Sequence, residues 1–121
     1  MPGLQAFLGV GRRMNRTVNE ADVDQVYDLA ADLFRVLSSP LRLRIIKSLC
    51  EREKNVGELL SEVETTQPNM SQHLNTLFKA GVLAKRRDGV LIYYRISDER
   101  VASLCRIVCA QVAYDANLIA I

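Results

Sequence analysis

The chain has 121 residues, of which 49% are hydrophobic and 25% charged, and its formal net charge of +2 is too small to indicate nucleic-acid binding by itself. Its length suits one domain with a modest core, and no apolar run reaches the roughly 18 residues that would cross a bilayer. Three cysteines without a secretory signal argue against a disulfide framework and indicate reduced thiols in a cytoplasmic protein.

The first 18 residues contain glycines, a proline and arginines without a sustained period, so they are expected to form an N-terminal tail. Met14 within this tail is an alternative start residue. A first helix is predicted from Asn19, a plausible N-cap, with apolar residues at helical spacing: Val23, Val26, Tyr27, Ala30, Leu33, Phe34 and Leu37. A second is predicted from Pro40 to near Glu51, with the stripe Leu41, Ile45, Ile46 and Leu49.

Two short helices joined by a tight turn are predicted next. Asn55 can cap the first of them, and Thr66 can cap the second, which has Pro68 in its opening turn and closes at Ala80 and Gly81. Their inward-facing residues are expected to be Val56, Leu59, Leu60 and Val63 in the first helix and Met70, Leu74 and Leu77 in the second.

A β-hairpin and a last helix complete the predicted order. Residues 83–87 and 90–96 have the β-branched and aromatic content of paired strands, joined by a type I′ turn at Asp88 and Gly89. Asp98 can cap a last helix with the stripe Val101, Leu104, Cys105, Val108, Cys109 and Val112. Residues 118–121 are expected to form an apolar C-terminal tail, which leaves one domain at 19–117.

This order of a helix-turn-helix followed by a basic hairpin predicts a mainly α winged helix, in which the second of the paired helices enters the major groove of DNA. Gln and Asn side chains pair with adenine, and Ser contacts bases or phosphates. The hairpin supplies the concentrated positive charge that phosphates attract. The predicted DNA-binding residues are Gln67, Asn69, Ser71, Gln72, His73, Asn75, Lys79, Lys85, Arg86 and Arg87.

Three alternatives to DNA binding account for these residues less well. Lysine and arginine commonly protect exposed strand edges, but here they accompany a polar-fronted recognition helix. A winged helix that binds only proteins through its last helix and apolar tail is a second alternative, which the salt dependence of DNA binding would separate. A thiol enzyme would need an activating base or a C-x-x-C motif, and the chain has neither outside His73. No catalytic residue and no cofactor are therefore predicted.

Three stretches resemble the signature segments of the ArsR/SmtB family of bacterial winged-helix repressors: LSSPLRLRIIKSL, TTQPNMSQHLNTLFKAGVL and RRDGVLIYYRI. The resemblance covers about residues 19–112 and implies a homodimer, formed by the first and last helices, that leaves its operator when an inducer or stress acts. The long apolar stripes of those helices support a dimer independently. Two-fold symmetry then predicts an imperfect inverted repeat as the operator.

His73 matches the family's S-x-H-L position. It is interpreted either as a phosphate or base contact or as a hydrogen-bonding residue that fixes the helix-turn-helix. The family's metal-binding positions lack ligands here. Asn55 and Gly57 stand where a cysteine pair would be, and of the residues at the second zinc site only Asp98 can ligate; the others are Arg100, Gln111 and Tyr114.

Cys50, Cys105 and Cys109 remain as candidate sensors. They are interpreted as inert packing residues, as a redox or reactive-sulfur pair, or as a trigonal site for a thiophilic metal or arsenite. The redox interpretation follows from the resemblance, which implies a bridge between Cys50 and Cys105 or Cys109. The sulfur nearest a basic residue is expected to be the thiolate, and the candidate neighbours are Arg42, Arg44, Lys47 and Arg106.

Overall fold

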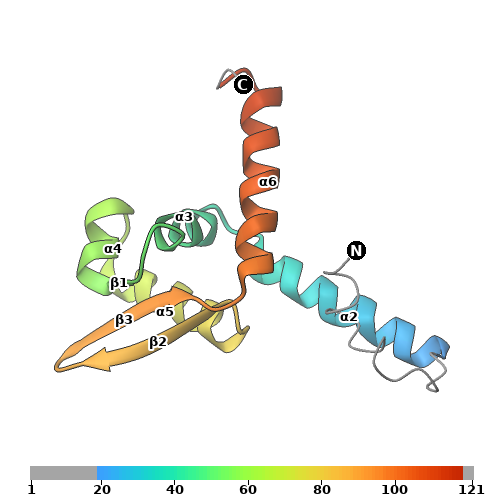
Figure 1. The fold of residues 1–121 in the computed structure, drawn as a ribbon, viewed down its shortest axis with the longest axis horizontal. Helices are drawn as coiled ribbons and strands as arrows, with labels where there is room; N and C mark the ends of the chain where they lie inside the picture. The colour runs from blue at the N-terminus through green and yellow to red at the C-terminus, as the bar shows by residue number, and fades with distance from the viewer. Residues whose placement is uncertain (1–18, 119–121) are drawn as a thin grey trace. The chain divides into compact units, whose positions relative to one another are not determined.

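The computed structural model describes residues 19–118, so the predicted N-terminal tail with Met14 and the last three residues of the predicted C-terminal tail lie outside the described part. The elements follow one another as α2 (Glu20–Leu37), α3 (Pro40–Leu49), β1 (Lys54–Asn55), α4 (Val56–Glu62), α5 (Gln67–Lys79), β2 (Leu83–Asp88), β3 (Leu91–Ile96) and α6 (Glu99–Asp115) (Figure 1). This order confirms the predicted mainly α winged helix-turn-helix. No helix within residues 19–118 is long and apolar enough to cross a membrane.

The chain divides between Phe34 and Arg35 into two compact units, each of which is described by itself. The prediction of one domain over residues 19–117 stays a prediction. In the first unit α2 carries apolar side chains that are exposed, namely Val23, Tyr27, Leu29 and Phe34.

Four of the five described helices begin at the cap that the sequence predicts, and the fifth, α3, is capped by Ser39, directly before the predicted Pro40. The side-chain oxygens of the capping residues accept hydrogen bonds from backbone N–H groups of the first helical turn, which have no partner inside the helix. The capping of α4 is reciprocal, because Asn55 accepts from the backbone of Glu58 at 2.9 Å while its own N–H donates to the Glu58 carboxylate at 3.0 Å. The five caps are Asn19, Ser39, Asn55, Thr66 and Asp98.

The core of the second unit lies where α3, α4 and α5 meet the sheet. Its largest fully buried apolar residues are Ile45, Ile46, Leu59, Met70, Leu74, Leu77 and Val82. They include the whole predicted inner stripe of α5, so the polar residues of that helix are turned away from the core. Burial of three large side chains on one face also fixes the rotation of α5 about its axis.

The sheet has three strands in the order β1-β3-β2, and all pairs are antiparallel. The short strand β1, paired with Tyr93 and Tyr94 of β3, was not predicted. The predicted type I′ turn is wrong. Asp88 pairs with Leu91, so the two loop residues are Gly89 and Val90. Of these two, Gly89 has a positive φ, at 65°, and Val90 does not. That pattern belongs to a type II′ turn.

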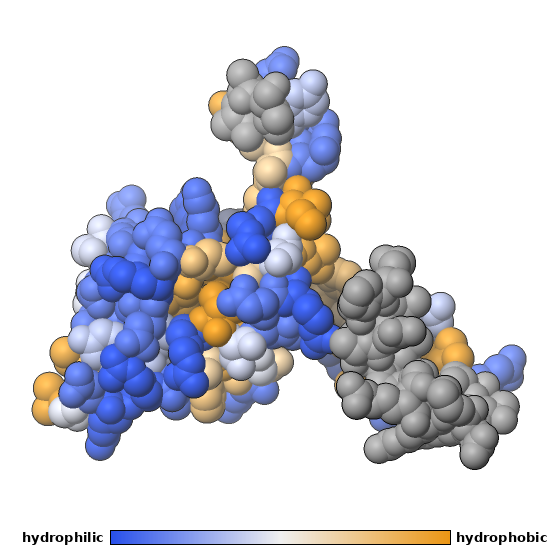
Figure 2. Space-filling view, viewed as in Figure 1, coloured by the Kyte–Doolittle hydropathy of each residue, from blue (hydrophilic) through white to orange (hydrophobic). Residues whose placement is uncertain are grey.

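The N-terminal half of α6 packs on the core, and the remainder is exposed. Its buried side chains are those of Val101, Ala102 and Cys105. Large apolar side chains farther along and around the helix are exposed, and Figure 2 shows apolar surface on this part of α6. The exposed set is Leu104, Ile107, Val108, Val112 and Tyr114. Such a concentration of apolar surface is typical of an interface.

Candidate DNA-binding surface and thiol cluster

The solvent face of α5 presents polar side chains that no protein group engages. Gln72, Asn75 and Lys79 lie at spacings of three and four residues, on the side opposite the buried stripe, and Gln67 and Ser71 lie beside them. All five are exposed. Within residues 19–118, no hydrogen bond or ion pair involves these five side chains, so their donors and acceptors face water and are available to an external partner.

Two other predicted residues of α5 have partners inside the protein. The amide of Asn69 donates to the Thr65 hydroxyl at 2.8 Å. His73 is half-buried, and its Nδ1 accepts from Arg42 Nε at 2.9 Å, while Arg42 Nη1 donates to the Val36 carbonyl at 3.0 Å. Burial and then the charge of Arg42 lower the pKa of His73, so the ring is neutral with its proton on Nε2. This is the helix-fixing hydrogen bond that the sequence left open, and it joins α5 to α3.

Strand alternation divides the predicted basic residues of the wing between two faces. Lys85 and Arg87 lie opposite Tyr94 and Ile92, on the face toward α5, and Lys85 Nζ is 4.4 Å from the centre of the Phe78 ring. Arg86 lies on the other face, where it bonds Glu53. The three predicted cations of the wing are therefore divided between its two faces.

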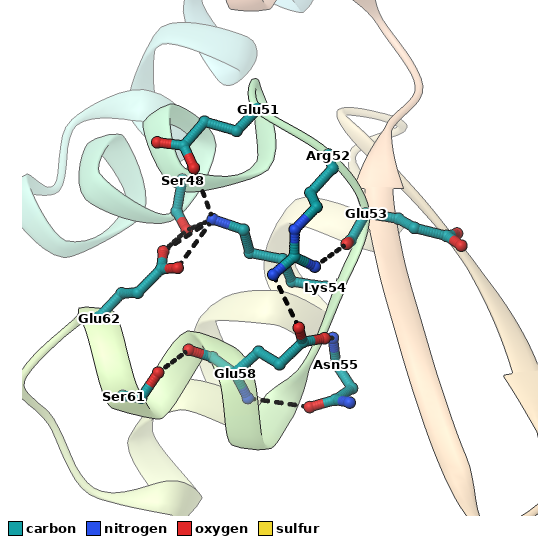
Figure 3. Close-up of polar contacts among 9 residues, drawn as sticks. All are labelled: Ser48, Glu51, Arg52, Glu53, Lys54, Asn55, Glu58, Ser61 and Glu62. Atoms are coloured by element: carbon teal, nitrogen blue, oxygen red, sulfur yellow. Dashed lines mark hydrogen bonds and ion pairs between the residues drawn. The ribbon is translucent and has the colours of Figure 1, made fainter.

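A buried lysine, which the sequence analysis missed, links α3 to α4. The Lys54 side chain is only 1% exposed, and its Nζ donates to Ser48 Oγ at 3.0 Å, to Glu51 at 3.1 Å and to both Glu62 oxygens at 2.8 and 2.9 Å (Figure 3). Ser48 also donates to Glu62. Burial lowers the pKa of Lys54, but hydrogen bonds and charges from Glu62 and Glu51 outweigh it and the net direction is upward. Lys54 is therefore a charged, satisfied core residue.

Cys50 lies at the C-terminal end of α3, and Cys105 and Cys109 lie one turn apart in α6, which packs on α3. Cys105 is buried, Cys50 is half-buried and Cys109 is exposed, and all three are free. Burial, and then electrostatic repulsion from Cys109 and Cys50, raise the pKa of Cys105. Arg106 Nη1 donates to Cys50 Sγ at 3.6 Å, so Cys50 has one of the basic neighbours named from the sequence.

Metal binding finds little support in this arrangement. Within the described residues, which include all three cysteines, no three His, Cys, Asp or Glu side chains are placed so that they could hold a metal ion. The Asp98 carboxylate caps α6 and forms an ion pair with Arg100 at 3.2 Å, so its oxygens already have partners inside the protein.

Comparison with known proteins identifies the family. The model of the arsR family of bacterial regulatory proteins matches residues 39–85. The transcriptional regulator Rv0081 of Mycobacterium tuberculosis is 44% identical over 82 residues, which are 67% of this chain and 72% of that protein. The chain belongs to the arsR family. This confirms the predicted ArsR/SmtB resemblance and, with it, a DNA-binding transcriptional repressor of that type.

Solved structures and a second relative agree with this assignment. The crystal structure of Rv0081 matches with a TM-score of 0.66 at 41% identity, covering 75% of this chain and 95% of that one. The homodimeric winged helix-turn-helix DNA-binding domain of Mycobacterium bovis Mb0332 gives a TM-score of 0.70 at 28% identity, covering 85% and 94%. The repressor SmtB of M. tuberculosis is 35% identical over 92 residues, covering 76% and 68%. For this arsR family member, the DNA-contacting residues and the inducer stay predictions.

Proposed function

We propose that this arsR family repressor binds an imperfect inverted repeat as a homodimer, and that a thiol-based signal at Cys50 with Cys105 or Cys109 releases or alters operator binding. The observation that carries the DNA-binding part is the unengaged polar face of α5 beside a wing that presents Lys85 and Arg87. In the free protein these exposed polar groups are hydrogen-bonded to water. On binding, they would form hydrogen bonds with base edges and phosphates of the operator instead.

A homodimer is supported by α6. Its exposed apolar residues would lose water on pairing with a second copy, and Mb0332, a structural relative, is a homodimer. A two-fold axis would present two α5 helices to successive major grooves, about one DNA turn apart. The proposed target is for this reason an inverted repeat, and the first helix, α2, is proposed as the other dimerisation helix.

We expect Gln72→Ala and Ser71→Ala to reduce the preference for operator over random DNA, each by about 1 to 3 kcal/mol if the side chain touches a base edge. Neither side chain contacts the core, so the fold should be unaffected. Titration of labelled operator and of a shuffled duplex by fluorescence anisotropy measures both affinities. An equal loss on the two duplexes would mean that these residues do not read bases.

The thiol-based signal is supported by the location of the cysteines, at the end of α3 and on α6, which packs on α3, and by the environment of Cys50. Its neighbour Arg106 is the type of cation that stabilises a thiolate, the form that attacks an oxidant. With peroxide, Cys50 would form a sulfenic acid and release water, and Cys105 or Cys109 would then displace a second water to give the disulfide. The thiols supply two electrons and peroxide accepts them.

A bridge of this kind has a route to the DNA-binding surface. Cys50 follows α3, whose Arg42 holds His73 of α5, while the other two cysteines lie in α6. Drawing the end of α3 toward α6 would shift the helix on which the recognition helix rests, and with it the spacing of the two α5 helices in the dimer.

Treatment with hydrogen peroxide or polysulfide, followed by counting of free thiols and an operator titration, tests this part. We expect two thiols to disappear per chain, operator affinity to change, and dithiothreitol to reverse both effects. Cys50→Ser should abolish the response without altering the affinity of the reduced protein. If the wild type loses its thiols and binds operator as before, the cysteines do not control DNA binding.

A further inference from the structure

The segment that joins α3 to α4 holds two parts of the molecule through alternate side chains. Arg52 and Lys54 pair with carboxylates of α4, at 2.9 Å to Glu58 and 2.8 Å to Glu62. Glu53 lies between them in sequence and reaches the opposite way, to Arg86 of the wing. Figure 3 shows the Glu53 side chain directed toward the strands and that of Lys54 directed toward α3 and α4. Successive residues of an extended segment point to opposite sides, so one short segment bonds both the helix-turn-helix and the wing.

Glu53 engages two of the three guanidinium nitrogens of Arg86, and the third, Nη1, lies 3.9 Å from the Asp88 carboxylate. Its Nε donates to both Glu53 oxygens at 3.0 and 3.2 Å, and its Nη2 donates to Oε1. Its central carbon lies 4.6 Å from the centre of the Tyr93 ring. Tyr93 pairs with Arg86 of β2 on one side and with Asn55 of β1 on the other. Hydrogen bonding to Arg86 also holds the pKa of Glu53 below its ordinary value, so the carboxylate is charged at neutral pH.

Such a paired arginine differs from a phosphate-binding one. A cation that already has a carboxylate partner releases no DNA counterion on binding, and the carboxylate itself repels phosphates. Arg87, the next residue, is exposed and has no ion pair within residues 19–118. The two neighbouring arginines are therefore equipped for different tasks.

We propose that Glu53 and Arg86 form a positioning pair, which sets the wing against the helix-turn-helix so that Lys85 and Arg87 reach the DNA backbone, and that Arg86 does not itself contact DNA. The proposal rests on the proposed DNA binding. Bidentate geometry fixes both the distance and the orientation of the two groups, which a single hydrogen bond to a lysine would not. Asn55, two residues after Glu53, caps α4, and α4 packs on α5, so the pair relates the wing to the recognition helix.

Glu53→Gln gives opposite results for a positioning pair and for an arginine that binds phosphate. Removing a negative charge near DNA, and freeing Arg86 for a phosphate, should tighten binding and steepen its salt dependence by about one counterion. Loss of a positioning pair should instead weaken operator binding, roughly two- to fivefold, the range in which exposed ion pairs act. We expect the weakening, measured by anisotropy on the full chain in a series of salt concentrations. Tightened or unchanged binding would overturn the proposal.

A double-mutant cycle with Arg86→Gln makes the test independent of either single variant. We expect both single variants to weaken operator binding. The double variant should bind operator with at least the affinity of the weaker-binding single variant, because either change alone breaks the pair. Arg87→Ala is the matched control: it should weaken binding to every duplex and flatten the salt slope. Additive effects in the cycle, or an Arg86→Gln slope as flat as that of Arg87→Ala, would assign Arg86 to the DNA backbone instead.

Thermal unfolding of the same variants separates positioning from simple stabilisation. A pair that only stabilised the fold would lower the melting temperature and leave the affinity of the folded protein unchanged, which would also refute the proposal. If the wild-type protein bound no operator fragment, the proposed function itself would be refuted. The anisotropy titration of the wild type, which precedes those of the variants, measures this.

Discussion

Ile107→Glu is expected to convert the protein to a monomer at micromolar concentration and to reduce operator affinity at least about 100-fold, because two half-sites would no longer be bound by one linked pair of recognition helices. Ile107 is 67% exposed, and it shares a face of α6 with Leu104 and Tyr114, three and seven residues away. A glutamate at the centre of that face would be buried without a partner in a dimer, and such burial costs several kcal/mol. In the monomer it would remain in water.

Sedimentation equilibrium measures the dimer, and circular dichroism verifies the helix content of each variant. Val90→Glu is the control for association, since it makes the same kind of change at a side chain that is 96% exposed, in the turn of the wing. Val90→Glu should remain dimeric. An Ile107→Glu protein that stays dimeric and binds operator normally would show that another surface joins the subunits.

The features that could be predicted from the sequence are those whose signals are local. Each of the five helix caps lies within three residues of the N–H group that it accepts from, so the capping residue and the first turn are read together. The inner stripe of α5 is equally local, since Met70, Leu74 and Leu77 recur at helical spacing. From these signals the order of elements, and so the winged helix, followed directly.

The features that were missed depend on partners far away in the chain. Lysine is rarely buried, and Lys54 is buried only because Ser48 and Glu62, on two different helices, converge on its amine. Strand β1 has two residues, too few for an alternating pattern, and exists through its pairing with β3. Neither feature has a local signature.

The division of the wing's basic residues was within reach. Once residues 83–87 are assigned to a strand, alternation places Arg86 on the opposite face from its two basic neighbours. Its partner was not predictable, because Glu53 precedes it by 33 residues and is brought there by the fold.

The burial of the cysteines could be predicted only in part. The four-residue spacing of Cys105 and Cys109 puts them on one face, but that one is buried and the other exposed depends on how α6 leaves the core.

Lys54→Ala should destabilise the protein by about 2 to 4 kcal/mol, because it removes a buried aliphatic stem as well as the cation that three side chains share. Ser48 Oγ would lose one of its partners, and the carboxylates of Glu62 and Glu51, which are partly exposed, would recover water in compensation. Urea denaturation followed by circular dichroism measures the free energy of unfolding. Since Lys54 lies between α3 and α4, the loss should appear in the whole cooperative transition rather than in a local one.

Two comparisons separate the stem from the charge. Lys54→Met retains most of the stem, so it should be less destabilised than Lys54→Ala. The hydrogen bond from Lys54, and then that from Ser48, lower the pKa of Glu62. The contribution of these hydrogen bonds to the free energy of unfolding is therefore complete above the ordinary pKa of a glutamate, about 4.3. It is lost as the pH falls through the lowered pKa of Glu62, because the carboxylate becomes protonated. The raised pKa of Lys54 keeps the amine charged across this range. The stability difference between the wild type and Lys54→Met should accordingly be constant near neutral pH and shrink below about pH 4. A difference independent of pH would mean that the ion pair contributes nothing and that Lys54 stabilises the fold through its stem alone.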